Sequence, residues 1–162
     1  MPRILDDFPH EEAVTRLKHA VGLTKSFTDE QIAALARIIV AEEYQADEVM
    51  MDEDEAASDI YVIISGTASV EMKLPAKDVA NAQILTVREN GIVGEFAFLD
   101  GSRRSASVRI LAPATVFRLP SDALRNLCET NTALGYRLMQ NLGALVTHRI
   151  RSINFGLRSS LQ

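Results

Sequence analysis

IYVIISGTASVEMKL, residues 60–74, is the stretch that decides the fold class of this chain. It is rich in Ile, Val, Tyr and Thr, which favour β-strands, and Ser65-Gly66 in its middle predicts a tight hairpin turn. Strands this short, with turn residues every roughly eight to twelve positions, are typical of a small antiparallel barrel or sandwich. The other strand candidates are residues 83–88, 91–94, 105–111 and 114–119, whereas residues 47–55 are a turn-rich acidic stretch around a short apolar core at 49–51.

Helical patterns stand on both sides of these strands. Residues 9–20 and 28–43 are predicted helices, and the second opens on a capping box from Thr28 to Gln31. After Pro120, Ser121 is expected to cap a helix to about residue 129, and Thr130 or Asn131 a longer one to about residue 154. The predicted fold is α+β in one domain (1–162), with N-terminal helices (1–45), an antiparallel β-roll of the double-stranded β-helix, jelly-roll-like kind (46–120) and two C-terminal helices (121–157).

Composition places the chain among soluble globular proteins, with 47% hydrophobic and 24% charged residues. The single cysteine, Cys128, excludes a disulfide framework and a CxxC pair, which favours a reducing compartment. The N-terminus lacks the basic and apolar regions of a signal peptide. The longest apolar run, residues 32–41, is half a membrane span and includes Arg37, so we expect a cytoplasmic protein with no transmembrane helix and no membrane partner.

Charge is distributed unevenly around a net value of −5, which argues against nucleic acid as a partner. Residues 1–102 hold 8 Lys/Arg and 20 Asp/Glu, a balance of −12, whereas residues 103–162 hold 9 Arg and 2 acids, a balance of +7. Two explanations stay open. The basic C-terminal part docks on the acidic N-terminal part, or it attracts an anionic ligand or partner.

The segment GEFAFLDGSRRSASV, residues 94–108, carries the candidate chemistry. Gly94 and Gly101 bracket a piece long enough for one helical turn. A helix that begins just after Gly94 aims the N–H groups of Phe96 and Ala97 outward, where they attract an anion such as a phosphate. The segment therefore predicts a phosphate cradle built from main-chain donors.

Two charged residues stand at opposite ends of the same segment. Arg104 can close on a phosphate with a two-pronged, charge-assisted bond, and Glu95 can accept hydrogen bonds from a sugar hydroxyl. Ser105 adds a hydroxyl, and Ala106 keeps the floor of the site small. Phosphate donors and a ribose acceptor describe a nucleotide site. The alternative is a Glu95–Arg104 salt bridge that merely holds a surface loop.

The full string resembles the phosphate-binding cassette of the cyclic nucleotide-binding domain family. IYVIISGTASVEM is similar to the strand–Ser-Gly–strand signature that precedes the cassette in that family, and the resemblance covers about residues 20–155. It implies N-terminal helices, an eight-stranded roll and two C-terminal helices. The positions that agree with the family pattern are Gly94, Glu95, Ala97, Leu99, Gly101, Arg104, Ala106, Ser107 and Val108.

The resemblance also implies what each residue does. Arg104 would pair with the phosphate of a cyclic mononucleotide, and Glu95 with its ribose 2′-OH. The N–H groups of Phe96, Ala97 and Ala106 would complete the cradle. Ser105 would touch the phosphate and influence the base, since threonine there tends toward cGMP and alanine toward cAMP. Serine is intermediate, and we expect cAMP.

Two positions depart from the family pattern. Asp47 and Glu53 stand where the family usually has turn glycines. Asp tolerates the left-handed backbone better than most residues, whereas Glu does not. These positions lie on the rim of the predicted roll, away from the site.

The last helix has two adjacent apolar faces, Leu138/Leu142/Leu145 and Met139/Val146/Ile150/Ile153. One must cover the roll, and the other can be extra core, a dimer seam or a lid for the base. The resemblance supports the last two, and we predict a homodimer through this helix. Because the chain ends at Gln162, we expect no helix-turn-helix and no DNA partner. Two alternatives stay open: a free-standing sensor that signals to an effector protein, or a fragment of a larger chain. Arg149, Arg151 and Arg158 are expected to be solvated or to contact the base.

Two other classes of protein were weighed. An enzyme is not expected, because His10, His19 and His148 fall on predicted helices rather than on the strands that a cupin-type metal site needs, so no metal and no cofactor are predicted. Nucleophile-elbow, HExxH and P-loop motifs are also missing. The second class is a degenerate roll that binds no ligand and serves as an interaction scaffold. It would be expected to lose Glu95 or Arg104, and this chain has both.

Overall fold

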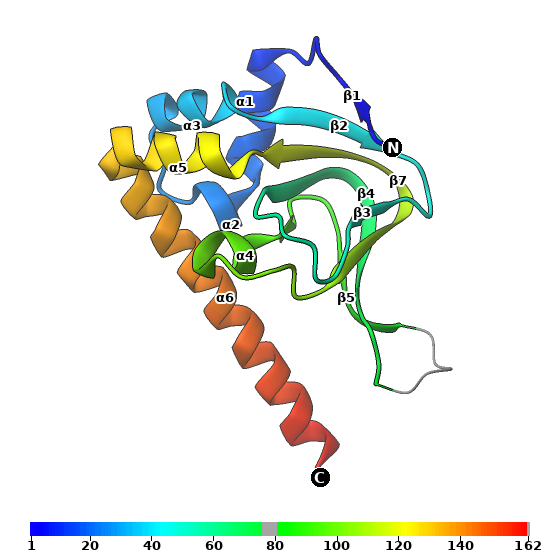
Figure 1. Cartoon of the computed structure of the whole chain (residues 1–162). Helices are drawn as coiled ribbons and strands as arrows, with labels where there is room; N and C mark the ends of the chain where they lie inside the picture. The colour runs from blue at the N-terminus through cyan, green and yellow to red at the C-terminus, as the bar shows by residue number, and fades with distance from the viewer. Residues whose placement is uncertain (76–80, 162) are drawn as a thin grey trace.

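The computed structural model describes residues 1–75 and 81–161, in which helices flank an antiparallel roll (Figure 1). The helices are α1 (His10–His19), α2 (Val21–Thr24), α3 (Asp29–Ala36), α4 (Glu95–Asp100), α5 (Ser121–Thr130) and α6 (Thr132–Ser160). The strands are β1 (Arg3–Ile4), β2 (Val40–Tyr44), β3 (Val49–Met51), β4 (Ile60–Met72), β5 (Ala82–Val87), β6 (Ile92–Val93) and β7 (Ser107–Leu119). The predicted fold class is confirmed.

The sheet is antiparallel and is built around two long strands. Its hydrogen-bonded order is β1-β2-β7-β4-β5, with β3 pairing with β7 and β6 pairing with β4. Strands β4 and β7 have 13 residues each and pair along most of their length. In Figure 1 the two strands curve together through the roll, and the helices gather at one end of it.

The uninterrupted apolar run at the start of β4 is explained by burial on both faces. Alternate side chains of a strand point to opposite faces. Ile60, Val62 and Ile64 belong to the core shared with the helices, whereas Tyr61 and Ile63 belong to the core inside the roll. The strand therefore joins the two cores.

The hairpin predicted at Ser65-Gly66 is wrong, because β4 runs straight through this position. Gly66 has φ +88°, and β4 and β7 shift register here, so that the pair bends instead of turning back. The bend brings Gly66 against Pro113 and Ala114 of β7. For the same reason the two strands predicted at 105–111 and 114–119 form the single strand β7.

The helix predicted over 28–43 is wrong at its C-terminal end. The capping box of Thr28 and Gln31 is confirmed, but α3 ends at Ala36, and Val40–Tyr44 form β2. All five β2 residues pair with β7. A short apolar run cannot be assigned to helix or strand by periodicity alone, and here the unsatisfied edge of β7 decides it.

The two C-terminal helices are confirmed, with small changes at their ends. Ser121 is the first residue of α5 rather than its cap, which is Pro120. The Asn131 side chain caps α6 by accepting a hydrogen bond from the main-chain N of Leu134. Near the middle of α6, the buried Asn141 side chain donates to the carbonyls of Leu23 (2.8 Å) and Lys25 (2.9 Å), which ties the helix to α2 and the residue after it.

One of the two left-handed turn residues expected from the family pattern lies one position later in the chain than predicted. Asp47 has φ +71°, as expected for an aspartate that replaces a turn glycine. The second left-handed residue is Asp54 (φ +68°), not Glu53, so the uncomfortable placement of a glutamate does not arise. Instead, the Glu53 main-chain N donates to the Ser107 hydroxyl (2.8 Å) and ties this turn to β7.

Replacing Gly66 should destabilise the roll. A Cβ at Gly66 would lie 2.5 Å from the Pro113 carbonyl oxygen and 2.7 Å from the Ala114 Cα, on a backbone that L-residues rarely adopt. We expect Gly66→Ala to lower the free energy of unfolding by about 2–3 kcal/mol in urea titrations. Gly156→Ala is the control, because nothing lies within 4 Å of a Cβ there, and it should be neutral or stabilising. Equal effects of the two would refute the role of Gly66.

Candidate functional site

A cavity of about 660 Å³ lies between the roll, α4 and the C-terminal half of α6. Its volume is within the roughly 300–1,000 Å³ of small-molecule sites. Apart from the predicted ligand-binding residues, most of the residues that line the cavity are apolar and come from the roll and from α6. Every residue predicted to contact a ligand lines it, namely Gly94, Glu95, Phe96, Ala97, Arg104, Ser105 and Ala106.

Helix α4 begins in a backbone conformation that glycine adopts most easily. Gly94 has φ +89°, and a Cβ there would lie 2.6 Å from the Asp59 carbonyl oxygen and 2.8 Å from Arg104 Nη1. The first N–H groups of a helix have no acceptor within it. Those of Phe96 and Ala97 are in this position, and both residues line the cavity. A side chain at Gly94 would disturb both the helix start and Arg104.

Arg104 is a buried cation whose hydrogen-bond capacity is only partly used. Its side chain donates from Nη1 to the Gly94 carbonyl (3.1 Å) and from Nη2 to the Asp59 carbonyl (2.8 Å), and the residue is 3% exposed. Within residues 1–75 and 81–161, its buried Nε has no partner and no carboxylate forms an ion pair with it. Burial lowers the pKa of the guanidinium. Such a group suits an anion that enters the cavity.

Glu95 is paired with α6 rather than with Arg104. Its carboxylate, 2% exposed, accepts a hydrogen bond from Arg149 Nη1, and Arg149 Nη2 also donates to the Ile92 carbonyl. The alternative of a Glu95–Arg104 salt bridge is therefore wrong for this structure. The expectation that Arg149 is solvated is wrong for this structure, whereas its contact with the base stays a prediction, because Arg149 lines the cavity. This arginine joins the cavity wall to the last helix.

The other residues near Arg104 differ in exposure. Arg103 is exposed and donates to the Asp54 carbonyl (2.9 Å), away from the lining of the cavity. Ser105 is exposed and Ala106 half-buried, although both line the cavity. The small side chain of Ala106 leaves room at the point where the segment joins β7.

Sequence reasoning offered the last helix as a lid for the base but did not identify which of its faces lines the cavity. Leu145, His148, Arg149, Ser152 and Ile153 all line the cavity, and they recur every three or four residues, the spacing of one helix face. That spacing was visible in the sequence. However, it could not show that this face turns toward residue 95, more than fifty positions away.

The uneven distribution of charge is explained in part by ion pairs between residues 103–162 and residues 1–102. Arg118 bridges Glu42 (2.7 Å) and Asp59 (3.2 Å), and Arg149 pairs with Glu95. With Arg109, which pairs with Glu71 (3.6 Å), three of the nine arginines in residues 103–162 pair with acids of residues 1–102, so the first explanation holds for part of the charge. Arg104 is different, since its partners are carbonyls and not carboxylates.

Residues 1–75 and 81–161 contain neither a candidate metal site nor a candidate membrane span. There, His, Cys, Asp and Glu form no group of three or more that could hold a metal ion. None of the helices in this part of the chain has the length and hydropathy of a membrane span.

Comparisons with known proteins agree with this geometry. The family model for the cyclic nucleotide-binding domain matches residues 41–131. A search of curated proteins finds no match. Among solved structures, a cyclic nucleotide-binding domain from Methylobacillus flagellatus KT superimposes with a TM-score of 0.82 at 24% identity, covering 92% of this chain and 84% of that one.

Two longer proteins share the fold. The regulatory domain of Toxoplasma gondii PKA, solved with cAMP, gives a TM-score of 0.70 at 15% identity, over 88% of this chain and 50% of that one. The Thermus thermophilus catabolite activator protein gives 0.71 at 17% identity, over 85% and 62%. This chain thus spans half to three fifths of their lengths.

Removing the Arg149 side chain should leave Glu95 buried without a counter-charge. We expect Arg149→Ala to lower the free energy of unfolding by about 2 kcal/mol in urea titrations. Adding Glu95→Gln should recover about half of the loss, because the buried group is then neutral. Arg151→Ala, on the exposed side of α6, is the control and should stay within about 0.5 kcal/mol of wild type. A loss no larger than the control's would contradict the pairing.

Proposed function

This chain belongs to the cyclic nucleotide-binding domain family, and from that premise we propose that its cavity binds a cyclic mononucleotide, cAMP in preference to cGMP. Domains of this family are regulatory rather than catalytic. The proposed role is accordingly that of a sensor whose C-terminal helices change position with ligand and signal to an effector protein. The proposed compartment is the reducing cytoplasm, because the single thiol, Cys128, cannot form a disulfide within the chain.

Arg104 carries this proposal. A buried guanidinium without a carboxylate is costly unless something compensates it. Two of its five N–H donors are held by carbonyls, and Nε has no partner among the described residues. An arginine with unused donors on the wall of a cavity is suited to a phosphate, which it binds with strong charge-assisted bonds.

The remaining lining suits the rest of a nucleotide. The N–H groups of Phe96, Ala97 and Ala106 would add donors to the phosphate, and the Glu95 carboxylate would accept from a ribose hydroxyl. Ser105 would stand beside the phosphate and influence the choice of base, as a residue intermediate between threonine and alanine. Apolar side chains that β4 and β5 contribute to the lining, Met72, Ile84 and Leu85, offer a surface for the base.

The pairing of Glu95 with Arg149 supports a response in α6. A sugar hydroxyl that donates to Glu95 shares or takes the acceptor now used by Arg149. Ligand can shift α6 only by binding one of its positions better than another, and competition for one carboxylate supplies such a difference. In this proposal Arg149 couples the occupied cavity to the last helix.

The competing proposal is a scaffold that keeps the roll but binds no nucleotide. The retention of both Glu95 and Arg104 on the cavity wall disfavours it. The net charge of −5 also disfavours nucleic acid as the partner of such a scaffold.

Calorimetric titration with cAMP and cGMP tests the proposal. We expect both to bind, cAMP more tightly. Arg104→Ala should weaken cAMP binding on the order of 100-fold, or about 3 kcal/mol, since the phosphate loses its buried counter-charge. Glu95→Ala should cost less. Arg103→Ala is the matched control and should leave affinity unchanged, because Arg103 is exposed and outside the lining of the cavity.

Two outcomes would contradict this assignment. Absence of heat with either nucleotide at millimolar concentration would favour the scaffold. Unchanged affinity in Arg104→Ala would show that the phosphate binds elsewhere.

A homodimer through α6 is the second part of the proposal. Its support is an apolar stripe whose members alternate at four and three residues, the spacing of a coiled-coil seam. Extra core is disfavoured, because several of these side chains are 39–57% exposed. The stripe consists of Met139, Gly143, Val146, Ile150, Ile153 and Leu157.

Light scattering after size-exclusion chromatography measures the molar mass in solution and so distinguishes a monomer from a dimer. We expect about twice the chain mass of 17.8 kDa for wild type. Ile150→Asp should give a monomer, because a charge would be buried in the seam. Ala144→Asp, exposed on another face of α6, should stay dimeric. A wild-type monomer with and without nucleotide would contradict the seam.

A further inference from the structure

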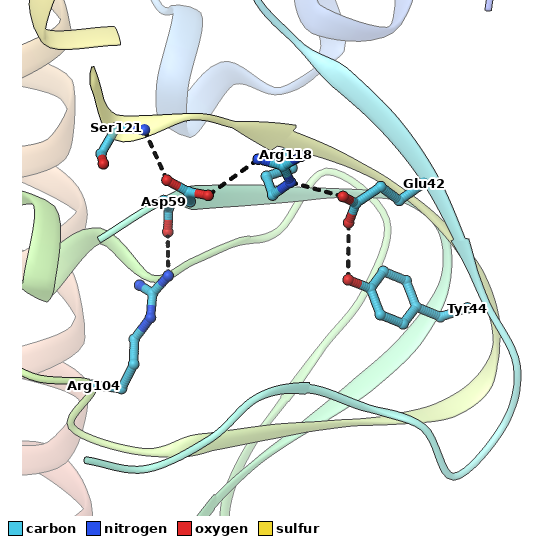
Figure 2. A network of polar contacts seen from close by, with 6 residues as sticks. All are labelled: Glu42, Tyr44, Asp59, Arg104, Arg118 and Ser121. Carbon is cyan, nitrogen blue, oxygen red and sulfur yellow. Dashed lines mark hydrogen bonds and ion pairs between the residues drawn. The ribbon is translucent and has the colours of Figure 1, made fainter. Parts of the chain in front are cut away.

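Asp59 immediately precedes β4 and binds three partners from other parts of the chain (Figure 2). Its main-chain carbonyl accepts from Arg104 Nη2 (2.8 Å), and its carboxylate accepts from the Ser121 main-chain N (2.8 Å) and from Arg118 Nη1 (3.2 Å). We propose that Asp59 is a positioning residue that aims the Arg104 guanidinium into the cavity and couples it to the first residue of α5. This inference rests on the proposed phosphate role of Arg104.

Arg104 depends on Asp59 for its orientation. The planar guanidinium is fixed by two carbonyls, those of Asp59 and Gly94, and by nothing else among the described residues. A displacement of the Asp59 peptide therefore turns the donors that would meet a phosphate. Prepositioned donors bind more tightly than donors that must first be ordered.

The first residue of helix α5 also depends on Asp59, through the side chain rather than the main chain. The cap residue is Pro120, and no side chain of the cap accepts a hydrogen bond from the helix. The Asp59 carboxylate, 62 positions earlier, accepts from the Ser121 N–H instead and places a negative charge at the positive end of the helix. Asp59 thus binds the arginine of the cavity wall through its main chain and the first N–H of α5 through its side chain.

The carboxylate is itself held in place. Arg118, which binds it, also donates from Nε to Glu42 (2.7 Å), and Glu42 accepts from the Tyr44 hydroxyl (2.8 Å). Figure 2 shows this chain of contacts running from β2 across β7 to Asp59. Because Arg118 restricts rotation of the Asp59 side chain, a displacement of the Asp59 main chain would also displace the carboxylate that binds the Ser121 N–H.

A second contact ties α5 to the same side of the cavity. Arg125 donates to the Phe98 carbonyl of α4 (3.0 Å), and its guanidinium lies 4.6 Å from the centre of the Phe98 ring. Helix α5 is therefore bound to α4 at one point and to Asp59 at another. A change at the Arg104 end reaches α5 through Asp59 even if α4 stays in place.

Ser121→Pro breaks the proposed link at one hydrogen bond. Proline lacks the N–H but is favoured at the first position of a helix, and Pro120 already has the extended backbone required before a proline. Ser121→Ala is the control, because it keeps the N–H. We expect Ser121→Pro to weaken cAMP binding about 5- to 10-fold in calorimetry, a typical coupling between sites, and Ser121→Ala to stay within twofold.

A double-mutant cycle on urea unfolding tests the link without any ligand. The cycle combines Arg104→Ala with Ser121→Pro, two positions that Asp59 joins in Figure 2. We expect the unfolding equilibrium constant of the double variant to differ at least about threefold from the product of the single effects, as coupled sites do. The same cycle with Ser121→Ala should be additive.

The outcomes separate the two proposals. Failure of the wild type to bind cAMP or cGMP overturns the proposed function, and a non-additive cycle would still support the link through Asp59. An additive cycle overturns the link whether or not nucleotide binds. Binding by wild type with equal affinities of Ser121→Pro and Ser121→Ala overturns the role of the link in the site.

Discussion

The guanidinium of Arg104 is buried, no carboxylate among the described residues forms an ion pair with it, and two main-chain carbonyls hold it in place. Such a group costs several kcal/mol unless dipoles replace its hydration. The carbonyls of Gly94 and Asp59 do so. Gly94 can offer its carbonyl because its backbone is left-handed and has no Cβ to collide with the arginine. One cation therefore fixes the start of α4 and the residue before β4.

The two C-terminal helices meet the cavity in different ways. Helix α6 contributes Arg149, which binds the carboxylate of Glu95 directly. Helix α5 is joined to the cavity indirectly, through Asp59 and through the Phe98 carbonyl of α4. In the proposed function the sugar end of the ligand acts on α6 and the phosphate end on α5, so the two helices report on different parts of one molecule.

Local sequence signals predicted most of the site and part of the fold. The cassette from Gly94 to Val108 is contiguous, so its resemblance to the family pattern was enough to identify the part of the cavity lining that this segment provides. Prediction failed where a partner distant in sequence decides the outcome. Gly66 looks like a hairpin glycine until β7 lies against it, and Val40–Tyr44 look helical until β7 pairs with them. The roles of Arg149 and Asp59 depend on contacts 54 and 62 positions away, which no local pattern contains.

The tie between Asn141 and the carbonyls of Leu23 and Lys25 gives α6 a mechanical character. It fixes the helix near its middle, and from there to Ser160 the helix rises about 28 Å at 1.5 Å per residue. The Glu95–Arg149 contact lies about 12 Å along this arm. A tilt of about 10° about the tie moves the contact by roughly 2 Å and the end of the helix by roughly 5 Å. Helix α6 is thus a lever that more than doubles a displacement made at the cavity.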